Sequence, residues 1–184
     1  MDRYQIPHVK TFEFTKIIGL ENIDFGKYII IDDYVFVYAK ERIKIGNYVH
    51  IASFTSISGG GELVMEDFSG FSSGCRIVTG SDDFKEGGFG NPTISEAFRN
   101  VHTGKIHVGK FAVVGSNSVI LPDVTIGEGA TVAAGSVVSK DLEPWGIYVG
   151  NRKVGTRDKE GVLKNYERFL TLPEEEQIGS LFRQ

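Results

Sequence analysis

The stretch that decides the fold is residues 108–139, which read VGKFAVVGSNSVILPDVTIGEGATVAAGSVVS. An aliphatic residue stands at every sixth position: Val108, Val114, Ile120, Ile126, Val132 and Val138. The next position is small in most cases: Gly109, Gly115, Gly127, Ala133 and Ser139. A second small or β-branched position recurs four residues after the aliphatic one: Ala112, Ser118, Val124, Ala130 and Ser136. The two sub-positions repeat together, which disfavours an ordinary β-sandwich with a chance period.

A period of six fits neither an α-helix, at about 3.6, nor a plain strand, at about 2. It fits a short strand followed by a sharp corner, so that three sides of six residues close a coil of about 18 residues. The aliphatic residue then points into a triangular prism, and the small residue leaves room at the corner. Because one coil cannot bury its own core, the coils must stack.

The same period appears earlier in pieces. One series runs from Ile17 to Val35, a second from Ile45 to Leu63, and a third, shifted series holds Met65, Phe71 and Ile77. The shifts near residues 36–44 and 63–65 predict an inserted turn or bulge in each place. We therefore expect an all-β parallel helix over residues 1–156.

The composition restricts the class of protein. The chain has 184 residues, 41% of them hydrophobic and 24% charged, as expected for one globular domain. The formal net charge of −4 disfavours a nucleic-acid partner. The single cysteine, Cys75, cannot form an internal disulfide, and no segment approaches the roughly 20 apolar residues of a membrane span. We expect a cytoplasmic protein.

The segment from Val113 to Ala130, continued by residues 133–141 and 148–151, resembles the C-terminal coils of the hexapeptide-repeat acyltransferases, in particular sugar acetyltransferases of the galactoside and O-antigen type. The resemblance implies a left-handed parallel β-helix. It also implies a homotrimer that binds acetyl-CoA between adjacent prisms, with no metal. The implied reaction moves an acetyl group to a hydroxyl or amino group of a sugar or nucleotide sugar, in surface-polysaccharide biosynthesis.

The resemblance also assigns a set of CoA-binding positions. Ser116 matches the residue after the glycine of one hexad, and Ala134 and Gly135 match a turn whose backbone meets the pantetheine arm. The remaining matches are Ser139, Lys140, Asn151 and Arg152. Lys140 is expected to reach the CoA phosphates, for which an ammonium group is suited. Arg152 stands where the family usually has proline, and is either a further cation for the nucleotide or a solvated charge.

The hexad register vanishes over about residues 78–107, and a long polar loop on a rigid scaffold usually carries function. In the family this excursion holds the acceptor and a catalytic histidine, whose position Asp82 occupies here. The candidate catalytic residues are Asp82, Asp83 and His102. The candidate substrate-binding residues are Ser81, Phe84 and Asn91.

Two interpretations of Asp82 and Asp83 stay open. If both carboxyl groups are buried, their adjacency would raise the pKa of one of them, whereas an Asx turn would leave both with a structural role only. Without the histidine an amine acceptor is favoured, because an amine needs less help from a base.

Two other functions remain open. The missing histidine would suit a non-catalytic β-helix scaffold. His102 and His107, with His50 as a third ligand, would suit a metal-dependent hydratase of the γ-carbonic-anhydrase type, although the surrounding residues do not resemble that family.

Residues 157–184 change to a helical period, and a second helix is expected to start at residues 171–176.

Overall fold

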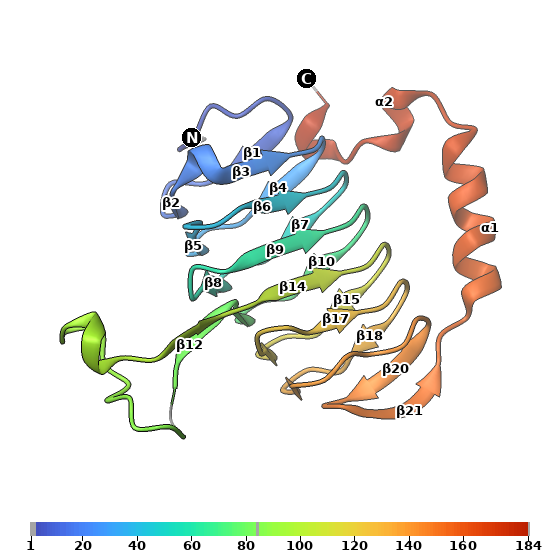
Figure 1. Cartoon of the computed structure of the whole chain (residues 1–184). Helices are drawn as coiled ribbons and strands as arrows, with labels where there is room; N and C mark the ends of the chain where they lie inside the picture. Colours follow the sequence, from blue (N-terminus) through green and yellow to red (C-terminus); the bar gives the residue numbers. More distant parts are fainter. Residues whose placement is uncertain (1–2, 84, 184) are drawn as a thin grey trace.

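The computed structural model describes residues 3–83 and 85–183, and it shows a left-handed β-helix of stacked triangular coils (Figure 1). Face A holds β1 (Val9–Thr11), β4 (Ile29–Ile31), β7 (His50–Ile51), β10 (Gly70–Phe71), β15 (Val113–Val114), β18 (Thr131–Val132) and β20 (Gly146–Val149). Face B holds β2 (Lys16–Ile18), β5 (Phe36–Tyr38), β8 (Ser56–Ser58), β11 (Arg76–Val78), β16 (Val119–Ile120) and β19 (Val137–Val138). Face C holds β3 (Ile23–Phe25), β6 (Ile43–Ile45), β9 (Glu62–Met65), β14 (Lys105–Val108) and β17 (Thr125–Ile126).

The aliphatic residues of the hexads form the core, as predicted. On face B they stack coil upon coil in one column of paired residues: Ile17, Val37, Ile57, Ile77, Ile120 and Val138. Every member of this column is buried. Each buried side chain of this size stabilises the fold by about 1.5–3 kcal/mol. The side chains of a column are buried by the coils above and below, so this stabilisation exists only when neighbouring coils are stacked.

The coils are not all of one length. Val113 pairs with Thr131, at the spacing expected of three hexads, whereas the pairing of Val9 with Ile29 closes a slightly longer coil. The longer coils contain strands that bury two alternate residues, such as Ile29 and Ile31 in β4. β6 and β9 do the same on face C. The predicted turns or bulges near residues 36–44 and 63–65 are therefore longer sides of the prism.

Small residues at the corners let the coils approach closely. A Cβ atom on Gly109 would lie 2.7 Å from the backbone nitrogen of Glu128, and one on Gly115 would lie 2.6 Å from that of Ala134. These contacts are too short for any side chain, so the repeat needs glycine there for the coils to reach hydrogen-bonding distance. The expectation of room at the corner is confirmed.

One excursion, residues 79–104, leaves the prism at the corner between faces B and C (Figure 1). Its stem is an antiparallel pair of strands, β12 (Gly80–Asp82) and β13 (Val101–Thr103), and its tip contains the short helix η2 (Glu96–Phe98). The expected range of 78–107 was too wide, because residues 105–107 belong to β14 on face C.

The C-terminal segment returns along the corner between faces C and A. It consists of β21 (Arg152–Thr156), α1 (Lys159–Leu170), α2 (Glu174–Gln177) and η3 (Ser180–Phe182) (Figure 1). α1 packs on a column of corner aromatics: the ring of Phe169 meets those of Tyr48 and Phe68 at 5.2 and 5.4 Å. A further short helix, η1 (Leu20–Asn22), lies near the N-terminal end of the prism. Within residues 3–83 and 85–183, no helix is long and apolar enough to cross a membrane.

Candidate active site

The residues expected at the pantetheine arm lie along one edge of the prism, the corner between faces A and B. Ser116 occupies this corner in one coil, and Ala134 and Gly135 occupy it in the next. The backbone nitrogen of Gly135 donates a hydrogen bond of 2.8 Å to the carbonyl oxygen of Ser116. Ala134 and Gly135 are exposed and Ser116 is half-buried. The hexads thus bring these positions, which lie one full coil apart in the chain, into one accessible line.

This corner leads into a groove of about 430 Å³ on face A. Its lining includes His50, Ser69, Gly70, Ser72, Ser73 and Ser116. The groove exists because His50, Gly70 and Val113 occupy equivalent outward positions on three adjacent strands, and the middle one has no side chain. Serine hydroxyls and backbone groups around an apolar floor suit a polar acyl carrier better than a purely apolar ligand.

At the C-terminal end of the prism, Ser139, which follows β19 of face B, and Asn151, which follows β20 of face A, tie two coils together. The amide oxygen of Asn151 accepts a 2.9 Å hydrogen bond from the backbone nitrogen of Ser139, and its nitrogen donates at 2.8 Å to the Ser139 hydroxyl. Both contacts hold the turn after β20 in place. Lys140 and Arg152 flank this turn with exposed side chains. The structure thus places two exposed cations at the C-terminal end of the prism, Lys140 after β19 of face B and Arg152 after β20 of face A.

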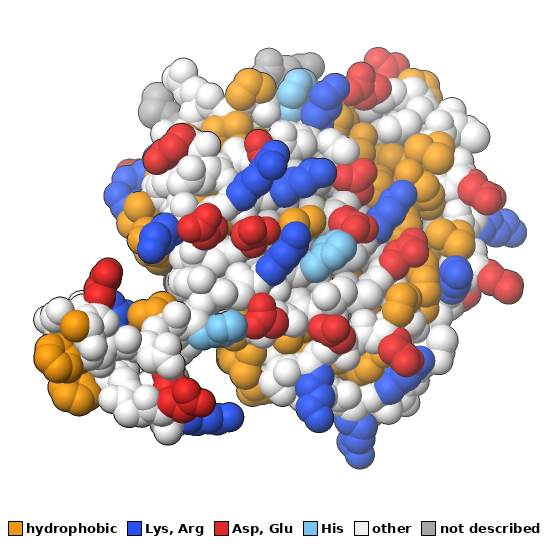
Figure 2. All heavy atoms as spheres, viewed as in Figure 1, with side chains coloured by type: hydrophobic (Ala, Val, Ile, Leu, Met, Phe, Trp, Pro, Cys, Tyr) orange, Lys and Arg blue, Asp and Glu red, His pale blue; other side chains and the backbone are white. Residues whose placement is uncertain are grey.

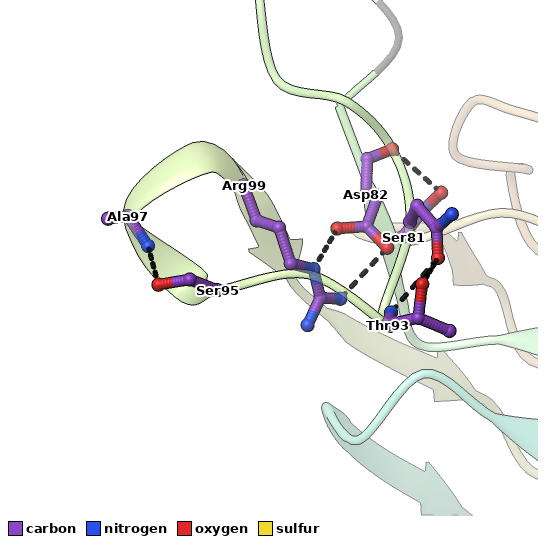
Figure 3. A network of polar contacts seen from close by, with 7 residues as sticks. Ser81, Asp82, Thr93, Ser95, Ala97 and Arg99 are labelled. Carbon is purple, nitrogen blue, oxygen red and sulfur yellow. Dashed lines mark hydrogen bonds and ion pairs between the residues drawn. The ribbon is translucent and has the colours of Figure 1, made fainter.

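In the excursion, Asp82 makes a two-pronged ion pair with Arg99 (Figure 3). Both N···O distances are 2.9 Å, and the side chains are only 12% and 17% exposed. The hydroxyl of Ser81 donates to the backbone oxygen of Asp82 at 3.0 Å. Sequence reasoning did not identify Arg99, the partner that joins the two strands of the stem, because it lies well beyond Asp82 in the chain and belongs to no motif.

Asp83 shapes the turn that follows. Its carboxylate accepts hydrogen bonds from the backbone nitrogens of Lys85 and Glu86 at 2.7 and 2.8 Å. The Lys85 amide is the largest of the contacts that lower the pKa of Asp83. A carboxyl pKa raised by adjacency therefore does not describe Asp83, and the Asx-turn alternative describes its geometry. Asn91 also makes a local turn, accepting from Thr93, and Phe84 lies outside the described residues.

His102 lies at the root of the excursion and contacts Asp123, with 2.6 Å between Nε2 and the carboxylate. The hydrogen bond from His102 is the main cause that lowers the pKa of Asp123, and the backbone nitrogen of Lys105 adds to it. His107 contacts a different carboxylate, that of Glu66, at 2.8 Å. Among the described residues no group of three or more metal-ligating side chains comes together, so nothing in the geometry favours the hydratase alternative.

Face C, the face that carries His107, is a solvated surface of alternating charge (Figure 2). Its pairs include Lys105 with Glu62 at 3.5 Å and Arg42 with Asp24 at 2.5 Å. His102 belongs to this side of the molecule, whereas the groove lies on face A. In the described part of the chain, the lining of the groove contains no excursion residue. Within one chain, the expected acceptor loop and the expected CoA corner are therefore separate.

Proteins that resemble this chain include several acyltransferases. Residues 105–140 match the model of the family described as bacterial transferase hexapeptide (six repeats). The chain is 34% identical to dTDP-4-amino-4,6-dideoxy-D-glucose acyltransferase of Escherichia coli over 144 residues, 78% of this chain and 75% of that one. It is 35% identical to AntD, an N-acyltransferase from Bacillus cereus solved with dTDP and 3-hydroxybutyryl-CoA, with a TM-score of 0.83 over 89% of this chain and 87% of that one.

The fold extends further than this sequence similarity. A maltose O-acetyltransferase from Clostridium difficile 630 is 19% identical, with a TM-score of 0.63 over 76% of this chain and 72% of that one. At that identity the comparison shows the fold alone. The E. coli relative shows more, because its identity extends over most of both chains. The chain belongs to the hexapeptide-repeat acyltransferases, and it is an enzyme that moves an acyl group from a CoA thioester to a sugar.

Proposed function

We propose that this protein transfers an acyl group from acyl-CoA to the amino group of a deoxyaminosugar carried on dTDP. The observation that carries this proposal is the line of Ser116, Ala134 and Gly135 along one corner that opens into the groove on face A. The E. coli relative is named for an acceptor of this class, and AntD was solved with dTDP and an acyl-CoA. The missing loop histidine agrees with an amine acceptor, since a neutral amine attacks a thioester without a strong base.

CoA fits the residues of this corner together with those at the C-terminal end of the prism. The exposed backbone at Ala134 and Gly135 suits the pantetheine arm, and Lys140 and Arg152 suit the phosphates, because ammonium and guanidinium groups both bind phosphate. When bound, CoA supplies an activated carbonyl carbon. The amine nitrogen forms a bond to that carbon, the carbon–sulfur bond breaks, and the thiolate takes up the proton that the nitrogen loses.

The acceptor loop serves a neighbouring copy in a homotrimer. Face B lies between the corner with the groove and the corner with the excursion, so a three-fold ring around face B brings the loop of each copy to the groove of the next. The outer surface of face B supports this arrangement, because Ile18, Phe36 and Tyr38 are exposed on it. At the adjoining corner Phe14, Tyr34 and Phe54 form a flat stack with 51–59% of each side chain exposed. Such a surface is typical of protein contacts.

Within the loop, the Asp82–Arg99 pair holds the stem, and Ser81 and Asn91 face the sugar nucleotide. A cytoplasmic location and a role in surface-polysaccharide synthesis belong to the same proposal, because both substrates are activated metabolites and nucleotide sugars are the usual donors for glycan assembly.

The test measures release of free CoA from acetyl-CoA and from 3-hydroxybutyryl-CoA. The acceptors are dTDP-4-amino-4,6-dideoxyglucose and dTDP-glucose, of which only the first carries an amino group. We expect release with the amino sugar at least about tenfold faster than with dTDP-glucose, with an N-acylated product in the mass spectrum. Equal release with both sugars would contradict N-acylation. A protein that does not bind acetyl-CoA in a calorimeter would instead be the non-catalytic scaffold.

A further inference from the structure

One histidine lies in the groove itself. His50 is carried by β7 and forms part of the groove's wall, one strand away from Gly70. Its side chain is 53% exposed, so the ring is accessible from the groove. The other histidines with carboxylate partners, His102 and His107, lie on the far side of the prism. His50 is thus the histidine that the fold places beside the CoA corner.

A carboxylate fixes the ring. Nε2 of His50 lies 3.1 Å from Oδ2 of Asp32, which stands one coil below at the same corner. Asp32 is only 27% exposed and also accepts a 3.5 Å contact from the hydroxyl of Ser53. A carboxylate next to Nε2 favours the tautomer with its hydrogen on that nitrogen, which leaves the lone pair of Nδ1 free to accept a proton. The arrangement is that of a base and its orienting group.

We infer that His50, oriented by Asp32, accepts the proton from the sugar amine during acyl transfer. The inference rests on the proposed function and adds the residue that moves the proton. As the nitrogen–carbon bond forms, one N–H proton passes to Nδ1 of His50. As the carbon–sulfur bond breaks, the same proton passes from the imidazolium to the thiolate, which leaves as CoA–SH. His50 returns to its neutral form, and no other reactant is needed.

The position of Gly70 agrees with this role. Because Gly70 lacks a side chain, the space beyond His50 stays open toward Ser116, one of the residues expected at the pantetheine arm. The excursion of a neighbouring copy supplies binding groups to the same groove. Asp82 is engaged with Arg99 and Asp83 with backbone amides, so neither is arranged to receive the proton. The loop binds the sugar and the groove carries the base.

The test uses His50→Gln, His50→Ala and Asp32→Asn, with His107→Gln as the matched control, since His107 is another histidine paired with a carboxylate. Turnover is measured with acetyl-CoA and dTDP-4-amino-4,6-dideoxyglucose. We expect His50→Gln to lower kcat by about 10²-fold or more, the usual size of general-base loss, with KM for both substrates within about threefold. Asp32→Asn should lower kcat by about tenfold with KM unchanged, because it only orients the ring. His107→Gln should stay within about twofold of the unaltered protein.

Chemical rescue separates a base from a structural group. Free imidazole should restore part of the turnover of His50→Ala and should not affect His107→Gln. A kcat for His50→Gln within about threefold of the unaltered protein would overturn the inference and leave the proposed function standing. An unaltered protein that binds acetyl-CoA but acylates no amino sugar would overturn both. Melting temperatures of the variants, measured alongside, show that each is folded.

Discussion

At the scale of single residues, the groove depends on the absence of a side chain at Gly70. A Cβ atom there would lie 3.2 Å from the carbonyl oxygen of His50, a tight but tolerable contact. Larger branches would project into the groove between His50 and Val113. We therefore predict that Gly70→Val lowers turnover by at least about tenfold, because a misplaced substrate loses the benefit of orientation. Gly179→Val is the control, since that position faces open space, and it should leave turnover unchanged.

Asp82 provides a second prediction at this scale. If its ion pair with Arg99 shapes the acceptor loop, Asp82→Asn should raise KM for the sugar nucleotide by about tenfold or more, with a smaller effect on kcat. The affinity for acetyl-CoA should not change, because the corner proposed to bind it lies elsewhere. A kcat that falls about 10²-fold with KM unaltered would instead identify Asp82 as the base. Steady-state kinetics over both substrates distinguishes the two results.

At the scale of elements, the contact between His102 and Asp123 anchors the excursion to the prism. Asp123 also accepts a 3.1 Å hydrogen bond from the backbone nitrogen of Lys105, the first residue of β14. Because folding lowers the pKa of Asp123, this anchor stabilises the protein above the unfolded pKa, about 3.9, and is lost as the pH falls below it. Asp123→Asn should therefore lower the melting temperature by about 2–4 °C at pH 7, and the difference should shrink toward pH 3. An equal difference at both pH values would contradict this.

The C-terminal helices form a second separable element. Tyr28 donates its phenolic hydrogen to Glu174 of α2, and this contact raises the pKa of Tyr28 to about 12. Tyr48 donates to Gln177 of the same helix at 3.2 Å. Stability from Tyr28 is complete below its unfolded pKa of about 10 and falls as the pH rises from there toward 12. In an ultraviolet titration, Glu174→Gln should move one tyrosine back toward about 10. An unchanged titration curve would mean that α2 does not hold Tyr28.

Some elements could be predicted from the sequence, and others could not. The hexads of residues 108–139 determine which side chains face inward, so the core and the close corners followed from spacing. The positions Ser116, Ala134 and Gly135 were assigned by the resemblance to the family. The excursion was found because the period stops, but its internal contacts were not. The pairing of Asp82 with Arg99 and of His102 with Asp123 depends on how two strands of irregular sequence meet, and no period encodes that.

The longer N-terminal coils had a signal that hexad spacing misses. Aromatic residues recur once per coil at two corners: Phe14, Tyr34 and Phe54, and Tyr28, Tyr48 and Phe68. All but Phe14 adopt a positive φ angle, which is costly for a side chain of this size, and stacking between adjacent coils offsets the cost. The constant spacing of these aromatics, slightly longer than three hexads, would have given the coil length, and with it the register that places His50 beside Gly70.

At the scale of the whole molecule, the groove and the acceptor loop lie at different corners of one prism. The proposed function therefore predicts that a single copy is incomplete and that activity requires the loop of a neighbour. The exposed aromatic stack and the apolar patch on face B are the surface that we predict for that contact. Face C carries ion pairs instead, and we predict that it stays in solvent.

The most direct test of a site shared between copies is complementation in mixed oligomers. Gly70→Val blocks the groove and Arg99→Ala breaks the loop stem, and each variant alone should have little activity. Co-expressed in equal amounts, they should form rings in which about a quarter of the sites join an intact groove to an intact loop, so that about a quarter of the acyl-transfer activity returns. Mixed oligomers with no more activity than the two variants apart would show that each copy builds its site alone, and would contradict this account.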